Sequence, residues 1–407
     1  MAIQYHRDVL PNGLTLLAET DPSAATAAVG FFVRTGTRDE RPEEMGVSHF
    51  LEHMVFKGSE RRGPVETSEE LDDLGLEHNA FTSHEMTVYY ASGLPESILQ
   101  GAEVLADILR PALREADFEE ERGVILEEIA MYADQPYWVL MEEAGERYFR
   151  NHPLGFRVLG TTETISKLPV EAMRRYFALR YASDSVAVAA AGNIDFAEFR
   201  ERVAAACSSW SPSGAKREHP ALAPGSGDFT LRRPELAAAY GVMQMPAVDL
   251  LDPRRYEASL VAQILGDSEG SRLFWSLVET GLAEQADASF DPRDGVGEMS
   301  VHWVCDPEAH EEVEAVVRRE LAAFAGSLTD EDLVRSRAKV ATSVTLAGER
   351  PSGRMHRLGA NWTVGREYAT LEEELARIER VTLRSLHEYL EAFPLVPRMT
   401  GRLLPEA

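Results

Sequence analysis

The chain has 407 residues, of which 44% are hydrophobic and 27% are charged, a composition typical of a folded protein. This length exceeds that of one compact core and predicts two domains. The formal net charge of −27 excludes nucleic acid as an expected partner, because its phosphates would be repelled. The same charge would attract basic peptides to an acidic cleft, and it equally fits a solvated acidic surface.

The sequence indicates neither disulfide bonds nor a membrane segment. Its two cysteines, Cys207 and Cys305, lack CxxC spacing and suggest no cysteine zinc site. The N-terminal stretch MAIQYHRDVLPNGLTLLAE has no basic segment followed by an apolar run, and no stretch approaches about 18 apolar residues. We therefore expect a cytoplasmic enzyme with no membrane partner.

The first half is predicted to begin with a hairpin, because Asn12-Gly13 lies between alternating apolar residues. A strand over 25–35 leads to a helix near 46–59, and Glu43 and Glu44 are expected to oppose the positive end of that helix dipole. Two strands are expected within 77–92. The following elements are helices near 97–109, 117–132, 141–149, 170–179 and 196–206, with a strand at 185–191.

The composition changes at residues 208–227, SSWSPSGAKREHPALAPGSG, which are rich in Ser, Pro and Gly and typical of a linker. We therefore predict one domain over 1–207 and a second over 228–407. Predicted strands in the second lie at 229–231, 237–245, 286–290 and 298–305, and helices at 254–265, 272–279, 308–325, 330–346, 371–380 and 383–391. This order parallels the first half in an α+β manner.

The stretch 46–59, GVSHFLEHMVFKGS, carries metal-ligand spacing. In a helix, His49, Glu52 and His53 share one side. Two imidazoles four residues apart are about one turn from each other, so both can reach one metal ion with the carboxylate beside them. The order His-x-x-Glu-His marks the zinc proteases called inverzincins. The opposite side is an apolar stripe suited to a core, made of Val47, Phe50, Leu51, Met54 and Val55.

A third metal ligand is expected, because a catalytic zinc typically takes three from the protein. The helix-like stretch 117–132 contains Glu121 and Glu128, which are seven residues apart and so share a face. We assign Glu128 as the third ligand and Glu121 as an outer neighbour that accepts a hydrogen bond from a ligand histidine. Glu127 is the competing choice for the ligand.

These residues resemble the site of the M16 metallopeptidases, which include pitrilysin, insulin-degrading enzyme and the mitochondrial processing peptidase. In that family a glutamate follows the motif by about 75 residues, with another glutamate seven positions earlier. Here 128 − 53 = 75 and 128 − 121 = 7. Asn79, Ala80, Phe81 and Thr82 resemble the family's substrate-binding edge strand. The segments 152–155, 160–161, 191–193 and 270–274 extend the resemblance over most of the chain.

The resemblance implies a two-domain M16B-like member in which each domain is a mostly antiparallel β-sheet packed with helices. Only the first domain would carry metal, one Zn²⁺ per chain on His49, His53 and Glu128. Zinc lowers the pKa of a water molecule toward about 7, and Glu52 acts as general base. The substrate would be an unfolded peptide paired along residues 79–82. The same ligands also accept manganese or cobalt.

The second domain departs from the family pattern. Many members supply an arginine and a tyrosine that hold the substrate carbonyl, but the matching stretch 273–286, LFWSLVETGLAEQA, has Val278 and Glu284 there. Neither side chain can donate the required hydrogen bonds. Two alternatives to a self-sufficient endopeptidase stay open: a non-cleaving or partner-dependent subunit of a heteromeric complex, and a hydrolase of small amides. The resemblance implies a dimer, of like chains or with a related chain.

Overall fold

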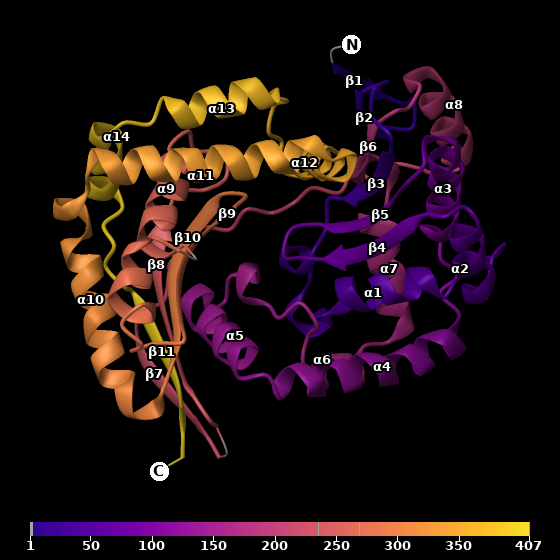
Figure 1. Ribbon diagram of the computed structural model, residues 1–407. Helices are drawn as coiled ribbons and strands as arrows, with labels where there is room; N and C mark the ends of the chain where they lie inside the picture. The colour runs from indigo at the N-terminus through magenta and orange to yellow at the C-terminus, as the bar shows by residue number, and fades with distance from the viewer. Residues whose placement is uncertain (1–2, 235, 268, 407) are drawn as a thin grey trace. The chain divides into compact units, whose positions relative to one another are not determined.

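The computed structural model describes residues 3–234, 236–267 and 269–406, which form two compact units (Figure 1). The first unit comprises Met1–Ala130, Phe156–Glu218 and Leu346–Tyr368, and the second comprises Met131–Gly155, His219–Thr345 and Ala369–Ala407. The sequence predicted contiguous ranges. The compact units are instead discontinuous in sequence. Residues 131–155 belong to the second unit, and residues 346–368 belong to the first.

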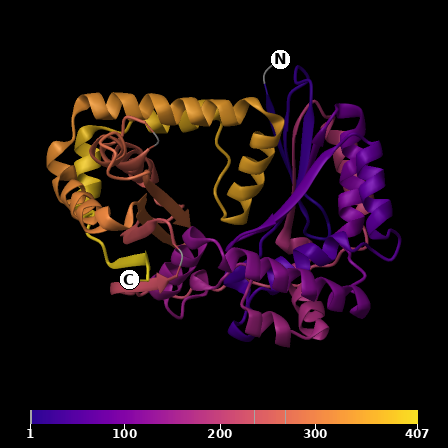
Figure 2. The ribbon, with the colours of Figure 1, turned by 60° about the horizontal axis from the view of Figure 1, so that its bottom comes forward.

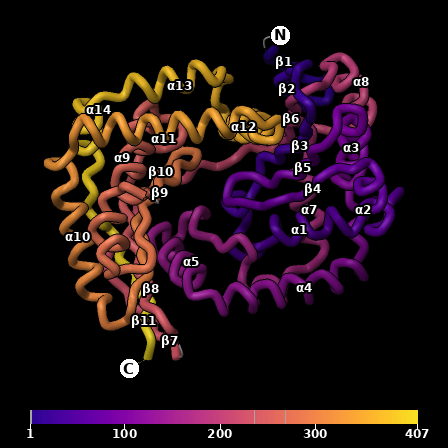
Figure 3. Tube along the Cα trace, viewed as in Figure 1, coloured from indigo at the N-terminus to yellow at the C-terminus, as the bar shows by residue number. Residues whose placement is uncertain are grey.

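The first unit contains a six-stranded sheet in the order β1-β2-β6-β3-β5-β4 (Figure 3). β2 and β6 pair in parallel, and all other neighbours are antiparallel. The predicted hairpin is confirmed as β1 and β2, with Gly13 at a φ of 90° in the turn. The strands are β1 (Gln4–Val9), β2 (Thr15–Thr20), β3 (Ala27–Val33), β4 (Glu77–Thr82), β5 (Thr87–Gly93) and β6 (Val186–Gly192).

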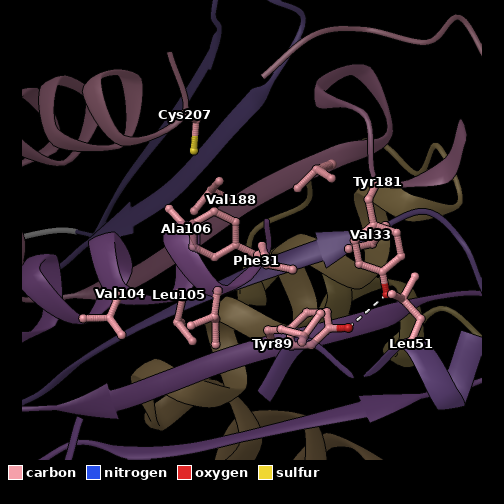
Figure 4. Close-up of a cluster of buried hydrophobic side chains, with 14 of the residues drawn as sticks. Phe31, Val33, Leu51, Tyr89, Val104, Leu105, Ala106, Tyr181, Val188 and Cys207 are labelled. Atoms are coloured by element: carbon pink, nitrogen blue, oxygen red, sulfur yellow. Dashed lines mark hydrogen bonds between the residues drawn. The ribbon is translucent and has the colours of Figure 1, made fainter. Parts of the chain in front are cut away.

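This sheet is buried on both faces, and successive side chains of β3 alternate between two apolar clusters. Phe31 faces the larger cluster, where it packs with Val188, Leu105 and Tyr89 (Figure 4). The Tyr89 and Tyr181 hydroxyls are 2.9 Å apart within this cluster. The helices on this face are α1 (Val47–Phe56), α2 (Pro64–Asp73), α3 (Pro95–Ile108), α4 (Glu115–Ala133), α6 (Thr162–Lys167), α7 (Val170–Arg180) and α8 (Phe196–Ala206).

The other face of this sheet is covered by α12 (Pro351–Thr363), which comes from the C-terminal half of the chain (Figure 2). Met355 and Leu358 pack on Phe32 there. Gly359 allows the close approach, because a Cβ at this position would lie 2.1 Å from the Phe32 ring. The sequence pattern does not predict this helix, because α12 has two glycines and few large apolar residues.

The second unit contains a five-stranded sheet in the order β7-β11-β8-β10-β9, with β7 and β11 parallel and the other neighbours antiparallel. The spatial order of these strands and their relative directions match those of β2-β6-β3-β5-β4 in the first sheet. The matching strands also occur in the same order along the chain. The two units are therefore copies of one α+β arrangement. The strands are β7 (Gly227–Arg233), β8 (Ala239–Ala247), β9 (Gln285–Arg293), β10 (Val296–Cys305) and β11 (Met399–Pro405).

One face of the second sheet is covered by α5 (Pro136–Phe149), which precedes the sheet by more than 70 residues. Leu140 and Tyr148 of α5 pack there with Phe229, Val242 and Leu403. Thus each sheet receives one covering helix from the other half of the chain, which accounts for the discontinuity of the two units. The remaining helices of this part are α9 (Arg255–Gly266), α10 (His310–Ser327), α11 (Asp330–Glu349), α13 (Leu371–Glu379) and α14 (Leu383–Ala392), with the π-helix η5 at Phe274–Val278.

The predicted linker contains no helix or strand among its residues 210–226. Part of it is nevertheless anchored on the first unit, because the Arg217 side chain is 3% exposed. Its Nη2 donates to Asp39 Oδ2 at 2.8 Å, and Arg180 approaches the same carboxylate at 3.5 Å. This end of the linker is therefore held by a buried ion pair.

Candidate metal centre

Helix α1 presents the predicted two sides. Its apolar side is buried in the core at Val47, Phe50, Leu51, Met54 and Val55, as the sequence predicted. Gly46 begins the helix with a φ of 92°, and a Cβ there would lie 2.6 Å from the carbonyl oxygen of Leu159. Both the backbone conformation and the lack of space therefore require glycine at this position.

The N-terminus of α1 is capped by Glu40 rather than by Glu43 or Glu44. Glu40 is 6% exposed, and its carboxylate accepts hydrogen bonds from the Gly46 and Ser48 N–H groups, both at 2.8 Å. Burial, against the effect of these hydrogen bonds, raises the pKa of Glu40 to about 8. The sequence does not predict this role of Glu40, since nothing in the helical pattern connects the residue to α1.

His49 and His53 of α1 converge with Glu128 of α4. The two helices are labelled in Figure 1. The two Nε2 atoms lie 3.7 and 3.6 Å from Glu128 Oε2. Among the described residues, these three form the one group of His, Cys, Asp or Glu whose potential ligand atoms all lie within 4.8 Å of one another. The competing residue Glu127 is exposed and is not part of the group.

The spacing of these three atoms fits a metal ion. Around a tetrahedral zinc with bonds of about 2.0–2.1 Å, neighbouring ligand atoms are about 3.3 Å apart, close to the 3.6 and 3.7 Å observed. Both distances are too long for hydrogen bonds, and Glu128 Oε2 is buried with no hydrogen-bond partner among the described residues. A buried carboxylate oxygen that faces two imidazole nitrogens lacks a cation, and a metal would supply it.

The charge states of these groups also suit metal binding. Burial, and then the neighbouring His53, lowers the pKa of His49 to about 3, so its ring is neutral at pH 7. Neutral imidazole is the form that ligates a metal. Burial raises the pKa of Glu128, an effect that the neighbouring His53 opposes.

Glu121 lies beside His53. Its Oε1 is 2.8 Å from His53 Nδ1, which directs the Nε2 of that ring toward Glu128. Its Oε2 is 2.7 Å from the Nζ of Lys57, a residue that the sequence analysis did not single out. Although burial alone would raise it, the hydrogen bonds from Lys57 and His53 lower the pKa of Glu121.

Glu52 lies on the same side of α1 as the histidines and is hydrogen-bonded to the first sheet. Thr82 Oγ1 of strand β4 donates to Glu52 Oε2 at 2.6 Å. Burial raises the pKa of Glu52, and the Thr82 hydrogen bond opposes this effect. A partly buried carboxylate with a raised pKa, beside residues of metal-ligand type, is suited to accept and donate a proton.

Strand β4 lies at the edge of the sheet, and among the strands of the described residues it pairs with β5 alone. Its side chains alternate, with Ala80 and Thr82 partly buried toward the larger core and α1, and Asn79 and Phe81 exposed on the other side. Asn79 Oδ1 accepts the N–H of Ala80 at 2.8 Å. Backbone groups on the outer edge of β4 are therefore not paired within this sheet, and the Asn79 side chain accepts a hydrogen bond from one of them.

The departures noted in the second domain, Val278 and Glu284, both lie in the second unit. Val278 ends η5 and packs against the core of that unit, whereas Glu284 is exposed just before β9. Neither side chain carries the guanidinium or phenol donor that is expected at these positions.

Two histidines that face one glutamate, with a further carboxylate beside them, are residues of the types that can hold a catalytic metal ion. The chain matches the family model for insulinase (peptidase family M16) over residues 15–162 and that for the M16 inactive domain over residues 167–340. It therefore belongs to peptidase family M16.

Curated relatives of this chain carry zinc protease names. The chain is 34% identical to an uncharacterized zinc protease of Streptomyces coelicolor over 389 residues, which cover 92% of this chain and 84% of that protein. It is 29% identical to the uncharacterized zinc protease YmxG of Bacillus subtilis over 381 residues, which cover 92% of each. These relatives support a metallopeptidase.

Two solved structures share the fold. A protease from Helicobacter pylori superposes with a TM-score of 0.92 at 17% identity, covering 99% of this chain and 100% of that chain. A peptidase M16 inactive domain from Pseudomonas fluorescens has a TM-score of 0.90 at 17% identity, covering 99% and 98%. None of the helices within residues 3–234, 236–267 and 269–406 is both long and apolar enough to cross a membrane.

Proposed function

We propose that the protein is a zinc-dependent endopeptidase of the inverzincin type that hydrolyses unfolded peptides, with one zinc held by His49, His53 and Glu128. The observation that carries this proposal is the buried Glu128 oxygen, 3.7 and 3.6 Å from two imidazole nitrogens and without a hydrogen-bond donor of its own among the described residues. The zinc protease names of the relatives support the choice of metal.

Zinc bound there supplies an electrophile for the scissile carbonyl and acidifies a water molecule. Glu52 takes the proton from the attacking water and passes it to the leaving amine. Its Oε2 is held by Thr82, so the second oxygen is the one free to accept this proton. Glu121 accepts from His53 Nδ1 and thereby fixes the tautomer in which Nε2 is the ligand atom.

The substrate would pair with the edge strand β4 through its main chain, with contributions from Asn79, Ala80, Phe81 and Thr82. Main-chain pairing requires an extended and therefore unfolded peptide, and it does not depend on the sequence of that peptide. The net charge of −27 would favour basic peptides.

The test is cleavage of a mixture of unfolded peptides by the purified chain with zinc, compared with Glu52→Gln. We expect Glu52→Gln to contain one equivalent of zinc and to lose turnover by a factor of about 10² or more. Glu128→Gln should lose zinc, whereas Glu127→Gln, a change of the exposed neighbour, should keep both zinc and activity. Parallel loss of zinc and activity in Glu52→Gln would contradict the role of this carboxylate as base.

A second candidate function is a non-cleaving or partner-dependent subunit. Val278 and Glu284 favour it, because they occupy positions where a carbonyl-binding arginine and tyrosine are expected. A chain from a structure described as complex III2 from Candida albicans also shares the fold, with a TM-score of 0.86 at 18% identity. A zinc-loaded wild type that cleaves no peptide would support this function, and light scattering would then show whether the chain dimerises alone or needs a related chain.

A third candidate, a hydrolase of small amides, is separated by substrate length. An enzyme that pairs its substrate with β4 should cleave peptides of ten or more residues far better than blocked dipeptides. Equal rates on both would show that main-chain pairing contributes nothing to substrate binding.

A further inference from the structure

A chain of three side chains leads from the C-terminal end of α1 back to its ligand histidine. Lys57 follows His53 by one helical turn, and both reach the same carboxylate of Glu121 on α4. The Lys57 Nζ lies 2.7 Å from Glu121 Oε2, and His53 Nδ1 lies 2.8 Å from Glu121 Oε1. The Glu121 side chain is only 8% exposed, so this carboxylate has little access to water.

We propose that Lys57 is a positioning residue for the metal centre: by holding one oxygen of Glu121, it keeps the other against His53 Nδ1 and so fixes the metal-binding ring. This inference rests on the proposed function, because it takes His53 as a metal ligand. Lys57 itself belongs neither to the His-x-x-Glu-His motif nor to the edge strand β4, and it is not the proposed third ligand.

The geometry gives Lys57 this role because a glutamate carboxylate rotates easily about its last torsion. A cation on the outer oxygen of Glu121 fixes this torsion and leaves the other oxygen directed at His53 Nδ1. Without Lys57, Glu121 would retain a buried charge with one fewer partner, which favours its rotation away from the site.

The hydrogen bond between Glu121 and His53 is important because His49 has no comparable hydrogen bond among the described residues. His49 Nδ1 is buried and has no hydrogen-bond partner among the described residues. Its ring is therefore held by packing, and His53 is the ligand whose orientation is set by a side-chain hydrogen bond. Removal or reorientation of the Glu121 carboxylate should therefore lower the metal affinity.

The alternative is that Lys57 makes only a surface ion pair. It also approaches Glu120 at 3.4 Å, but the Glu120 side chain is 74% exposed, so that contact is screened by solvent. The contact with Glu121 is both shorter and more buried. Glu120 therefore provides a matched control for a neighbouring carboxylate of the same lysine.

The test is the zinc dissociation constant of the full chain, measured by competition with a chelator of known affinity, for wild type, Lys57→Met, Lys57→Arg, Glu120→Gln, Glu121→Gln and Lys57→Met/Glu121→Gln. Partners of this kind change metal affinity by about 10–100-fold when removed. We expect Glu121→Gln to weaken zinc binding within that range and Lys57→Met to weaken it about 3–10-fold. Lys57→Arg should recover most of the affinity, and Glu120→Gln should stay within about twofold of wild type.

The double variant decides whether Lys57 acts through Glu121. If it does, Lys57→Met should add no further loss in the Glu121→Gln background. Wild-type affinity in Lys57→Met, or full additivity in the double variant, would overturn the inference while leaving the metal site intact. Failure of the wild type to bind zinc would instead refute the proposed function, so the two failures are distinguishable. Co²⁺ absorption spectra of the same variants provide a second readout of ligand geometry that does not depend on activity.

Discussion

The buried Glu40 carboxylate should make the stability of the first unit depend on pH, and Glu40→Gln should remove that dependence. Burial raises the pKa of Glu40 from an ordinary 4.5 to about 8, despite the Gly46 and Ser48 hydrogen bonds. A group whose pKa is higher in the folded state stabilises the fold while it is protonated. Its contribution is therefore complete below about pH 4.5 and is lost as the pH rises through about 8.

The size of the effect follows from the pKa difference. The step from 4.5 to about 8, at about 1.36 kcal/mol per pH unit, corresponds to about 5 kcal/mol. A glutamine at position 40 accepts one N–H, and loss of the other acceptor costs about 1–3 kcal/mol. Near pH 5 the wild type should thus be more stable by up to about 2 kcal/mol, whereas near pH 9 Glu40→Gln should be more stable by about 2–4 kcal/mol.

The assay is urea unfolding in the presence of a chelator near pH 5, 7 and 9, for wild type and Glu40→Gln in parallel. The effects of all other titrating groups cancel in the difference between the two proteins. Glu43→Gln is the matched control, because Glu43 is exposed three residues away and should give a difference near zero at every pH. A stability difference that stays constant from pH 5 to pH 9 would refute the reasoning.

Three further predictions concern the site itself. Thr82→Val removes the 2.6 Å hydrogen bond to Glu52 and should lower kcat/KM about tenfold at unchanged zinc content, whereas Thr82→Ser should retain activity. Gly46→Ala places a Cβ 2.6 Å from a carbonyl oxygen at a φ of 92° and should cost about 2 kcal/mol or more in urea unfolding; Gly123→Ala, in open space on α4, should be neutral or stabilising. Zinc at about 1,000 times its dissociation constant should add about 4 kcal/mol to the free energy of unfolding of wild type, and calorimetry should show no such gain in Glu128→Gln.

The ligand helix could be predicted from the sequence because its information is local. The apolar residues of α1 recur with the helical period, so the side that carries His49, Glu52 and His53 follows from counting. The choice between Glu127 and Glu128 rested on the same geometry, since one residue rotates a side chain by about 100° around a helix. The structure brings Glu128 to the histidines and leaves Glu127 exposed.

The partners of these residues could not be predicted, because they depend on contacts between distant segments. Glu40 reaches α1 through a loop, and the pairing of Lys57 with Glu121 requires that α1 and α4 be placed side by side. Helix α12 could not be predicted because its glycines weaken the helical pattern, although Gly359 permits close packing on Phe32. Helix α12 comes from the C-terminal half of the chain but covers the first sheet, and α5 comes from the N-terminal half but covers the second sheet. The local sequence of a helix does not indicate which sheet it will cover.

The most direct measurement of the central claim is a crystal structure of the Glu52→Gln variant with zinc and an unfolded peptide, with zinc located by anomalous diffraction. We predict one zinc per chain, bonded to His49, His53 and Glu128, and a peptide paired as an added strand on the outer edge of β4. Zinc at other residues, or a peptide bound away from β4, would contradict this claim.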